Sequence, residues 1–308
     1  MRLFEAFAER IKGINAIPVT PFDEEGRIDY QAFAAVLDHL IESGMETIYP
    51  CGNTGEFYSL TISEANEIIS FAVRRIAGRA KVVAGVGYDA QTAASMAVHA
   101  ELAGADGVMV HQPVNPFMLD RGLAAYYQRV ARSTGLPLVL YVRSEQATAE
   151  TLREAAAEPN IVAVKYAVNH LPSFAKAVRL IGDELVWICG TAELWAPFFF
   201  AAGAVGFTSG MVNVDTVRPL RMLEALRAGR FGEAMLIWDE VRPFEELREA
   251  SRSGNNVSVV KEAMAQLGRC SGKVRPPIAE LLPEEKEQVR RILVGWGLLQ
   301  REKGGEGS

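Results

Sequence analysis

Lys165 is the residue of this 308-residue sequence whose position points most directly to chemistry. It follows four apolar residues, Ile161 to Val164, and so stands at the end of a predicted buried strand. Apolar surroundings lower the pKa of a lysine, and the resulting free amine can attack a carbonyl carbon and form a Schiff base. The alternative is a strand-end lysine whose charged head reaches solvent. Position alone does not separate the two.

Other strand ends carry polar groups that suit such a reaction. Tyr141 ends the preceding apolar run, and a phenol can pass protons to and from a carbonyl addition product; an amphipathic tyrosine at the edge of the core is the alternative. The loop Gly52-Asn53-Thr54-Gly55 follows another run, and its two glycines allow backbone N–H groups to converge on a carboxylate or phosphate. A tight turn without a ligand is the alternative. For His111 we expect a packed, hydrogen-bonded side chain rather than an acid or base.

Several other kinds of site are excluded by composition and motif. The four histidines and three cysteines form no HxH, HExxH or CxxC pair, so we expect no metal and no disulfide framework. No GxxxxGK[ST] phosphate loop is present, and we expect no diffusible cofactor. The net charge is −6 without a basic stripe, which argues against a nucleic-acid partner. No apolar stretch is long enough for a membrane span, and a reduced, cytoplasmic compartment is predicted.

Eight short apolar runs recur along the chain, most of them followed by an amphipathic segment. They cover residues 13–19, 47–51, 81–86, 107–111, 136–142, 161–165, 186–189 and 204–208. Runs without a clean alternation of apolar and polar residues are typical of parallel strands buried on both faces. The predicted helix N-caps between them are Asp29, Thr61, Asp89, Asp120 and Thr148.

Eight such units predict an α/β fold, a (β/α)8 TIM barrel with an N-terminal helix over residues 1–229. A doubly wound sheet is the alternative, and the absence of a GxGxxG turn after the first run argues against it. Three helical stretches without intervening strands, at 231–250, 257–267 and 283–299, predict a C-terminal helical region over residues 230–308.

Taken together, these residues resemble the dihydrodipicolinate synthase / N-acetylneuraminate lyase family. The resembling pieces occur in the family's order: Pro18 to Phe22, Gly52 to Glu56, Tyr141, Val164-Lys165, and Gly206 to Val214. The resemblance implies a barrel with a C-terminal helical region that assembles as a homo-oligomer, a tetramer or dimer. It also implies class I aldolase-type chemistry on a small-molecule 2-oxo acid.

The resemblance also implies roles for single residues. Lys165 would be the Schiff-base lysine and Tyr141 the general acid and base. Thr54 would bind the substrate carboxylate through its hydroxyl and N–H groups. The other substrate-binding residues would be Asn53, Gly55, Arg143, Thr208 and Ser209, the last two lining the pocket beside the lysine.

Departures from the family pattern bear on the substrate. Dihydrodipicolinate synthases usually have Thr-Thr where this chain has Asn53-Thr54. They usually carry two tyrosines after the fourth strand, one reaching into the next subunit, where this chain has Val114-Asn115. They also have an arginine five residues after the fifth-strand tyrosine, where this chain has Gln146.

A second branch of the family, the 5-dehydro-4-deoxyglucarate dehydratases, is similar at Gly55 to Leu60, at the Tyr141-x-Arg143 spacing and at Ser209. Those enzymes form a Schiff base at the 2-oxo group and then release water and carbon dioxide. We therefore predict a Schiff-base lyase of the keto-deoxy sugar acid dehydratase kind. The alternatives are a dihydrodipicolinate synthase, which condenses pyruvate with aspartate semialdehyde, and a non-catalytic protein that binds 2-oxo acids.

Overall fold

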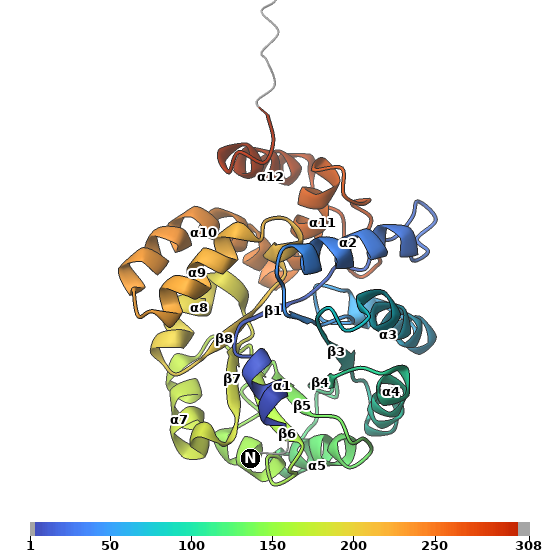
Figure 1. Cartoon of the computed structure of the whole chain (residues 1–308), viewed down its shortest axis with the longest axis vertical. Helices are drawn as coiled ribbons and strands as arrows, with labels where there is room; N and C mark the ends of the chain where they lie inside the picture. The colour runs from blue at the N-terminus through green and yellow to red at the C-terminus, as the bar shows by residue number, and fades with distance from the viewer. Residues whose placement is uncertain (1–3, 301–308) are drawn as a thin grey trace, which may run out of the picture.

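The computed structural model describes residues 4–300. Eight parallel strands close into a barrel in chain order (Figure 1). They are β1 (Ile14–Ala16), β2 (Thr47–Ile48), β3 (Lys81–Val86), β4 (Gly107–His111), β5 (Leu138–Val142), β6 (Ile161–Tyr166), β7 (Val186–Cys189) and β8 (Gly206–Ser209). The prediction of a (β/α)8 TIM barrel is confirmed.

A ring of helices surrounds the strands, as Figure 1 shows. They are α2 (Tyr30–Glu42), α3 (Ile62–Ile76), α4 (Ala90–Ala103), α5 (Asp120–Ala131), α6 (Ala149–Ala155), α7 (Leu171–Ile181), α8 (Ala192–Ala201) and α9 (Val217–Arg227). Three one-turn 3-10 helices add to them: η1 (Phe57–Ser59), η2 (Gly182–Glu184) and η3 (Met211–Asn213).

Most of the predicted N-caps are confirmed. Asp29 accepts a hydrogen bond from the Ala32 N–H group at 2.9 Å, and Thr61 forms a reciprocal capping box with Glu64. The prediction for Asp120 is wrong, because Leu119 occupies the cap position of α5 without a side-chain bond. Asp120 is instead the first helical residue, where its negative charge stabilises the positive end of the helix dipole.

The apolar core has two layers. One lies between the strands and the outer helices, and the other fills the barrel. Helix α1 (Glu5–Arg10) contributes Phe7 to the inner layer, and its ring packs so closely on Gly107 that a Cβ there would lie 2.7 Å from it. Since Gly107 begins β4, α1 covers the end of the barrel where the strands start.

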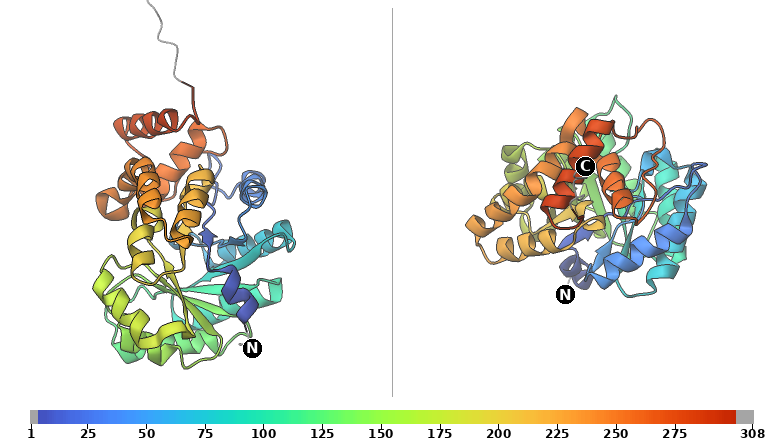
Figure 2. Two further views of the ribbon diagram at one scale, coloured as in Figure 1. Left: turned by 60° about the vertical axis from the view of Figure 1, so that its left-hand side comes forward. Right: turned by 90° about the horizontal axis from the view of Figure 1, so that it is seen from above.

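Three more helices follow the barrel: α10 (Phe231–Ser253), α11 (Asn256–Gln266) and α12 (Pro283–Gly295). Helix α10 packs against α8 and α9, while α11 and α12 lie at the end of the molecule opposite α5 (Figures 1 and 2). The last residues of α10 leave the helical conformation, since Ser251, Arg252 and Ser253 have φ angles of 55, 58 and 64°. Within residues 4–300, no helix is long and apolar enough to cross a membrane.

Candidate active site

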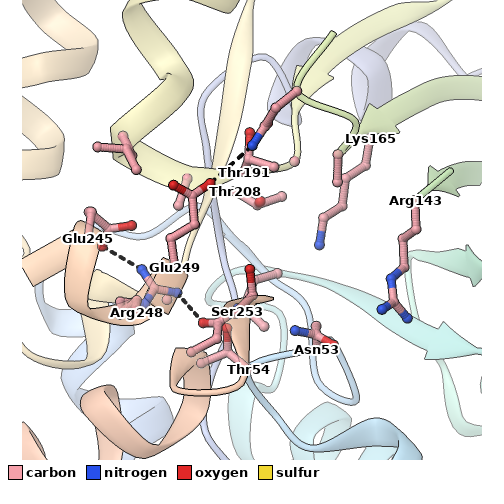
Figure 3. Close-up of a pocket in the computed structure, with 18 of the residues that line it drawn as sticks. Asn53, Thr54, Arg143, Lys165, Thr191, Thr208, Glu245, Arg248, Glu249 and Ser253 are labelled. Carbon is pink, nitrogen blue, oxygen red and sulfur yellow. Dashed lines mark hydrogen bonds and ion pairs between the residues drawn. The ribbon is translucent and has the colours of Figure 1, made fainter. Parts of the chain in front are cut away.

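Strand register brings the polar strand-end residues into one layer. Tyr141 pairs with Lys165 across β5 and β6, and His111 pairs with Tyr141 across β4 and β5. This layer lies at the carboxyl ends of the strands, where barrel enzymes place their active sites. A cavity of about 270 Å³ opens there, and its lining includes Asn53, Thr54, Tyr141, Arg143, Lys165 and Thr208 (Figure 3).

Lys165 lies deep in this cavity and is only 2% exposed. Its Nζ atom is 3.9 Å from the centre of the Tyr141 ring. Burial, assisted by the positive charge of Arg143, lowers the pKa of Lys165 to about 7. A substantial fraction of the side chain is therefore a free amine at neutral pH. The alternative of a lysine head in solvent is wrong.

Tyr141 is also buried, with 5% of its surface exposed. Burial raises the pKa of its phenol to about 12, while the charge of Arg143 acts in the opposite direction. The phenol is therefore protonated at neutral pH and can donate a proton or a hydrogen bond beside the Lys165 amine.

The loop after β2 is a tight turn with close packing beneath it. A Cβ on Gly52 would lie 2.6 Å from an Ile17 side-chain carbon, so only glycine fits there. The Gly55 carbonyl accepts a hydrogen bond from the Thr20 hydroxyl at 2.8 Å. Gly55 does not line the cavity; it allows the turn to form.

The same loop leaves backbone donors for a ligand. The N–H groups of Gly55 and Glu56 bond to the carbonyls of Gly52 and Asn53, each at 3.0 Å. In the part of the chain that the structure describes, the N–H groups of Asn53 and Thr54 donate no hydrogen bond. Both residues line the cavity, so the loop fits the predicted carboxylate site.

Arg143 lies at the exposed side of the cavity. Its guanidinium carbon is 5.4 Å from the centre of the Tyr58 ring and 5.9 Å from that of Tyr141. Its backbone N–H group donates to Gln112 Oε1 at 2.7 Å, which fixes the start of the loop after β5. Figure 3 shows Arg143 and Lys165 projecting into the same space.

The prediction that Ser209 lines the pocket is wrong. Its hydroxyl is hydrogen-bonded to the buried carboxyl of Glu193 at the start of α8, and it accepts the Val212 N–H group at 3.2 Å. Successive strand residues face opposite sides of a sheet, and here Thr208 takes the inward position. Burial raises the pKa of Glu193 to about 8, with the charge of Glu245 as the next contribution.

His111 is the packed side chain that was expected. Its Nε2 atom lies 2.9 Å from the Cys51 carbonyl oxygen, and its ring stacks on Phe57 with the ring centres 4.1 Å apart. Burial lowers the pKa of His111 to about 3, so the ring is neutral. The Tyr58 hydroxyl lies 3.4 Å from His111 Nδ1.

One wall of the cavity was not predicted at all. It comes from α10 and α11, and its residues are Glu245, Arg248, Glu249, Arg252, Ser253 and Asn256 (Figure 3). The available signal was an irregular apolar stripe, because Glu245 and Arg248 occupy helical spacings from Val241 and Phe244 and are buried with them. Charged residues in such a stripe indicate a paired or functional site.

Among the described residues, no group of three or more His, Cys, Asp or Glu side chains is arranged to hold a metal ion. The groups around the cavity that can take part in chemistry include the Lys165 amine, the Tyr141 phenol and several guanidinium groups.

The fold is a TIM barrel with a polar cavity at the carboxyl ends of its strands, and the similarity of the chain to known synthases and dehydratases identifies it as an enzyme of the lyase class. A family model described as "Dihydrodipicolinate synthetase family" matches residues 10–295, and the chain belongs to that family.

Its relatives carry two different names. A 4-hydroxy-tetrahydrodipicolinate synthase of Syntrophotalea carbinolica is 31% identical over 92% of this chain and 97% of its own length. A probable 5-dehydro-4-deoxyglucarate dehydratase of Ralstonia nicotianae is 32% identical over 93% of this chain and 94% of its own length. The crystal structure of dihydrodipicolinate synthase from Bacillus clausii matches with a TM-score of 0.92 and 42% identity, over 94% of this chain and 99% of that one.

Proposed function

We propose that this protein forms a Schiff base between Lys165 and a 2-oxo acid and uses it to break a bond in that substrate. The buried Lys165 amine, held over the ring of Tyr141, is the observation that carries the proposal. Its lowered pKa supplies the neutral nucleophile that carbonyl addition requires.

The proposed first step uses the two buried side chains together. The Lys165 amine adds to the 2-oxo carbon, and a proton passes to the former carbonyl oxygen to give a carbinolamine. Tyr141, which is protonated at neutral pH, donates a proton to that hydroxyl, so that it leaves as water. The resulting iminium draws electrons from the neighbouring bonds and favours cleavage or elimination there.

We propose a keto-deoxy sugar acid, of the 5-dehydro-4-deoxyglucarate kind, as the substrate. The departures at Val114-Asn115 and Gln146 and the Tyr141-x-Arg143 spacing support this choice over a synthase. Arg143 lies at the exposed side of the cavity, where its fixed charge suits the second carboxylate of a diacid. Several relatives are named as probable dehydratases of that acid.

A dihydrodipicolinate synthase is the second candidate, because relatives of similar identity and the Bacillus clausii structure carry that name. Two assays with the same preparation decide between them. We expect release of carbon dioxide from 5-dehydro-4-deoxyglucarate and little turnover of pyruvate with aspartate semialdehyde. The opposite pattern would reassign the substrate. A 2-oxo acid that binds without turnover of either substrate would favour the non-catalytic alternative.

We also propose that the chain forms a homo-oligomer. Residues 113–119 line a groove beside Tyr88 and Tyr126, and Val114, Phe117 and Leu119 are exposed there. This segment follows β4, where the family resemblance places a residue that reaches into the next subunit. A second copy of this chain is therefore the occupant that we propose for the groove. The cysteines Cys51, Cys189 and Cys270 are free, which suits the cytoplasmic location that we propose.

A further inference from the structure

Arg248 of α10 is a buried guanidinium at the edge of the cavity, and its side chain is only 6% exposed. Its Nη1 atom donates to Glu245 Oε1 at 2.5 Å, and its Nη2 atom donates to Asn256 Oδ1 at 2.7 Å. These two partners fix the plane of the guanidinium from both sides. An ordered, buried cation of this kind is an unusual component of a helix face that otherwise packs apolar side chains.

Arg248 borders the same space as the loop that carries Thr54. A Cβ built on Gly210 would lie 2.7 Å from Arg248 Nη2 and 2.8 Å from Thr54 Oγ1. Because Gly210 has no side chain, the Arg248 guanidinium and the Thr54 hydroxyl can both lie against it, and all three residues line the cavity. Figure 3 shows Arg248 and Thr54 close together near the C-terminal end of α10.

Arg248 also retains donors for a ligand. A guanidinium carries five N–H bonds in a planar fork, and the two protein partners use two of them. Its buried Nε atom has no hydrogen-bond partner among residues 4–300. Since that atom is closed to solvent, the donors left for a ligand are those on the Nη atoms.

The charges around Arg248 leave it able to attract an anion. Glu245 is its ion-pair partner, and it is the carboxylate that contacts the guanidinium among the described residues. Glu193, the next buried carboxyl, has its pKa raised to about 8 and is mostly uncharged at neutral pH. Glu249 bonds to Asn169 at 3.1 Å and to Trp195 at 3.2 Å, and so turns away from the guanidinium.

We propose that Arg248 binds the carboxylate next to the 2-oxo group of the substrate, together with Thr54, and that Glu245 and Asn256 position it. Arg143 would then serve the distal end of the substrate, and the Schiff-base lysine would lie between two cationic groups. A guanidinium matches a carboxylate in shape as well as in charge, which favours 2-oxo acids over neutral 2-oxo compounds. This inference rests on the proposed function.

Pyruvate is the probe, because it carries only the proximal carboxylate. Protein is incubated with increasing pyruvate and a fixed amount of borohydride, and the reduced adduct is measured by mass. The first variant is the double substitution Glu245→Gln with Arg248→Met, which removes both buried charges and so leaves neither one unpaired. We expect the pyruvate concentration at half-maximal adduct to rise about 10- to 100-fold, with an unchanged maximal yield.

The neutral analogue pyruvamide serves as the matched ligand. The wild-type protein is expected to prefer pyruvate, and the double variant to lose most of that preference. Arg248→Lys keeps the buried charge but not the fork, and we expect it to weaken pyruvate binding by about tenfold. This variant decides the matter if the double variant does not fold.

Half-maximal concentrations within twofold of wild type in the folded variants, with the preference for pyruvate kept, would show that Arg248 only holds α10 in place. That result would overturn this inference and leave the proposed function intact. No adduct in the wild-type protein with any 2-oxo acid would instead contradict the proposed function itself.

Discussion

The positive charge of Arg143 acts on the ionisation of Lys165. Burial lowers the pKa of Lys165 to about 7, and Arg143 contributes to the same shift. Only the neutral amine attacks a carbonyl, so the initial rate of adduct formation with pyruvate should follow the deprotonated fraction. We expect the rate to rise roughly 50-fold between pH 5 and pH 7 and to level off above pH 8. Trapping with cyanoborohydride across this range measures the profile.

Arg143→Gln is the variant that checks the cause of this shift. Removing the nearby positive charge favours the ammonium form, so the midpoint of the profile should move to higher pH. Arg143→Lys, which keeps the charge, should leave the midpoint close to that of the wild type. Pyruvate has no distal carboxylate, so a loss of substrate contacts at Arg143 does not confuse the result. Equal midpoints in all three proteins would contradict the assigned role.

Tyr141→Phe tests the proton donor. The ring that packs under Lys165 remains, but the phenol that would protonate the carbinolamine is lost. We expect the rate of adduct formation to fall by about 10²- to 10⁴-fold. Tyr127→Phe is the control, since its hydroxyl donates to the Tyr141 carbonyl at 3.2 Å outside the cavity. A Tyr141→Phe protein that forms adduct as fast as this control would exclude Tyr141 from the proton transfer.

A site residue could be predicted from the sequence where its position at the end of a strand alone determines that it lies in the cavity. Lys165 and Tyr141 line the cavity, as expected for residues near the ends of apolar runs, and Thr208, which the family resemblance named, lines it too. A strand that is buried on both faces carries apolar residues on both, so its sequence does not show which face points into the barrel. For this reason Ser209 was wrongly placed in the pocket. Arg248 was missed because it lies more than 80 positions along the chain from Lys165, and helical periodicity does not show which end of the barrel a later helix covers.

At the scale of the elements, helix α11 supports the loop at residues 52–56 through a buried ion pair. Lys261 of α11 forms an ion pair with Glu56, the residue after Gly55, and both side chains are fully buried. The Lys261 ammonium also donates to the Lys273 carbonyl oxygen at 2.8 Å and lies 4.0 Å from the centre of the Phe22 ring. The C-terminal helices therefore hold the loop that we propose binds the substrate carboxylate.

Lys261→Met should lower the free energy of unfolding by about 3–5 kcal/mol, because it leaves the Glu56 carboxylate buried without a partner. The double variant with Glu56→Gln removes both charges and still accepts the Arg275 N–H group that Glu56 binds at 3.0 Å. Its stability should therefore return most of the way to that of the wild type. Denaturant unfolding measures both variants. If the single variant were as stable as the double one, the buried pair would not hold the loop.

Helix ends show where local sequence signals suffice. Caps based on a side chain and its own next turn, such as Asp29 and Thr61, were predicted correctly. Asp120 was wrong by one position because the preceding Leu119 is extended and already begins the helix without a side-chain bond. The predicted end of a helical stretch at residue 250 is also confirmed, because Ala250, Ser251 and Arg252 have non-helical backbone angles.

At the scale of the whole molecule, attraction of an anionic substrate has to be local. The chain carries a net charge of −6, so its overall field repels a sugar diacid. The cavity nevertheless gathers four basic side chains, Arg143, Lys165, Arg248 and Arg252, against the two acidic ones of Glu245 and Glu249. The low-dielectric walls strengthen the attraction between these cations and an anion inside the cavity, while the outer surface stays acidic.

Assembly is the other property at this scale. Phe117 is 92% exposed in the groove at residues 113–119. Phe117→Asp should place a charge in the proposed subunit contact and shift the protein towards smaller species in sedimentation velocity experiments. Leu102→Lys, at an 83% exposed position on α4, is the control and should leave the sedimentation profile unchanged. A monomeric wild-type protein, or an unchanged Phe117→Asp oligomer, would exclude this groove as the contact.

Covalent trapping at Lys165 tests the central claim most directly. Protein is incubated with pyruvate or a keto-deoxy sugar acid, reduced with borohydride, weighed, and digested to locate the modified residue. We predict one adduct per chain on Lys165 in the wild-type protein and in Lys176→Ala, which removes an exposed lysine. We predict none in Lys165→Ala. An adduct that persists in Lys165→Ala, or a wild-type protein that turns over a 2-oxo acid but never traps, would contradict Schiff-base catalysis by this residue.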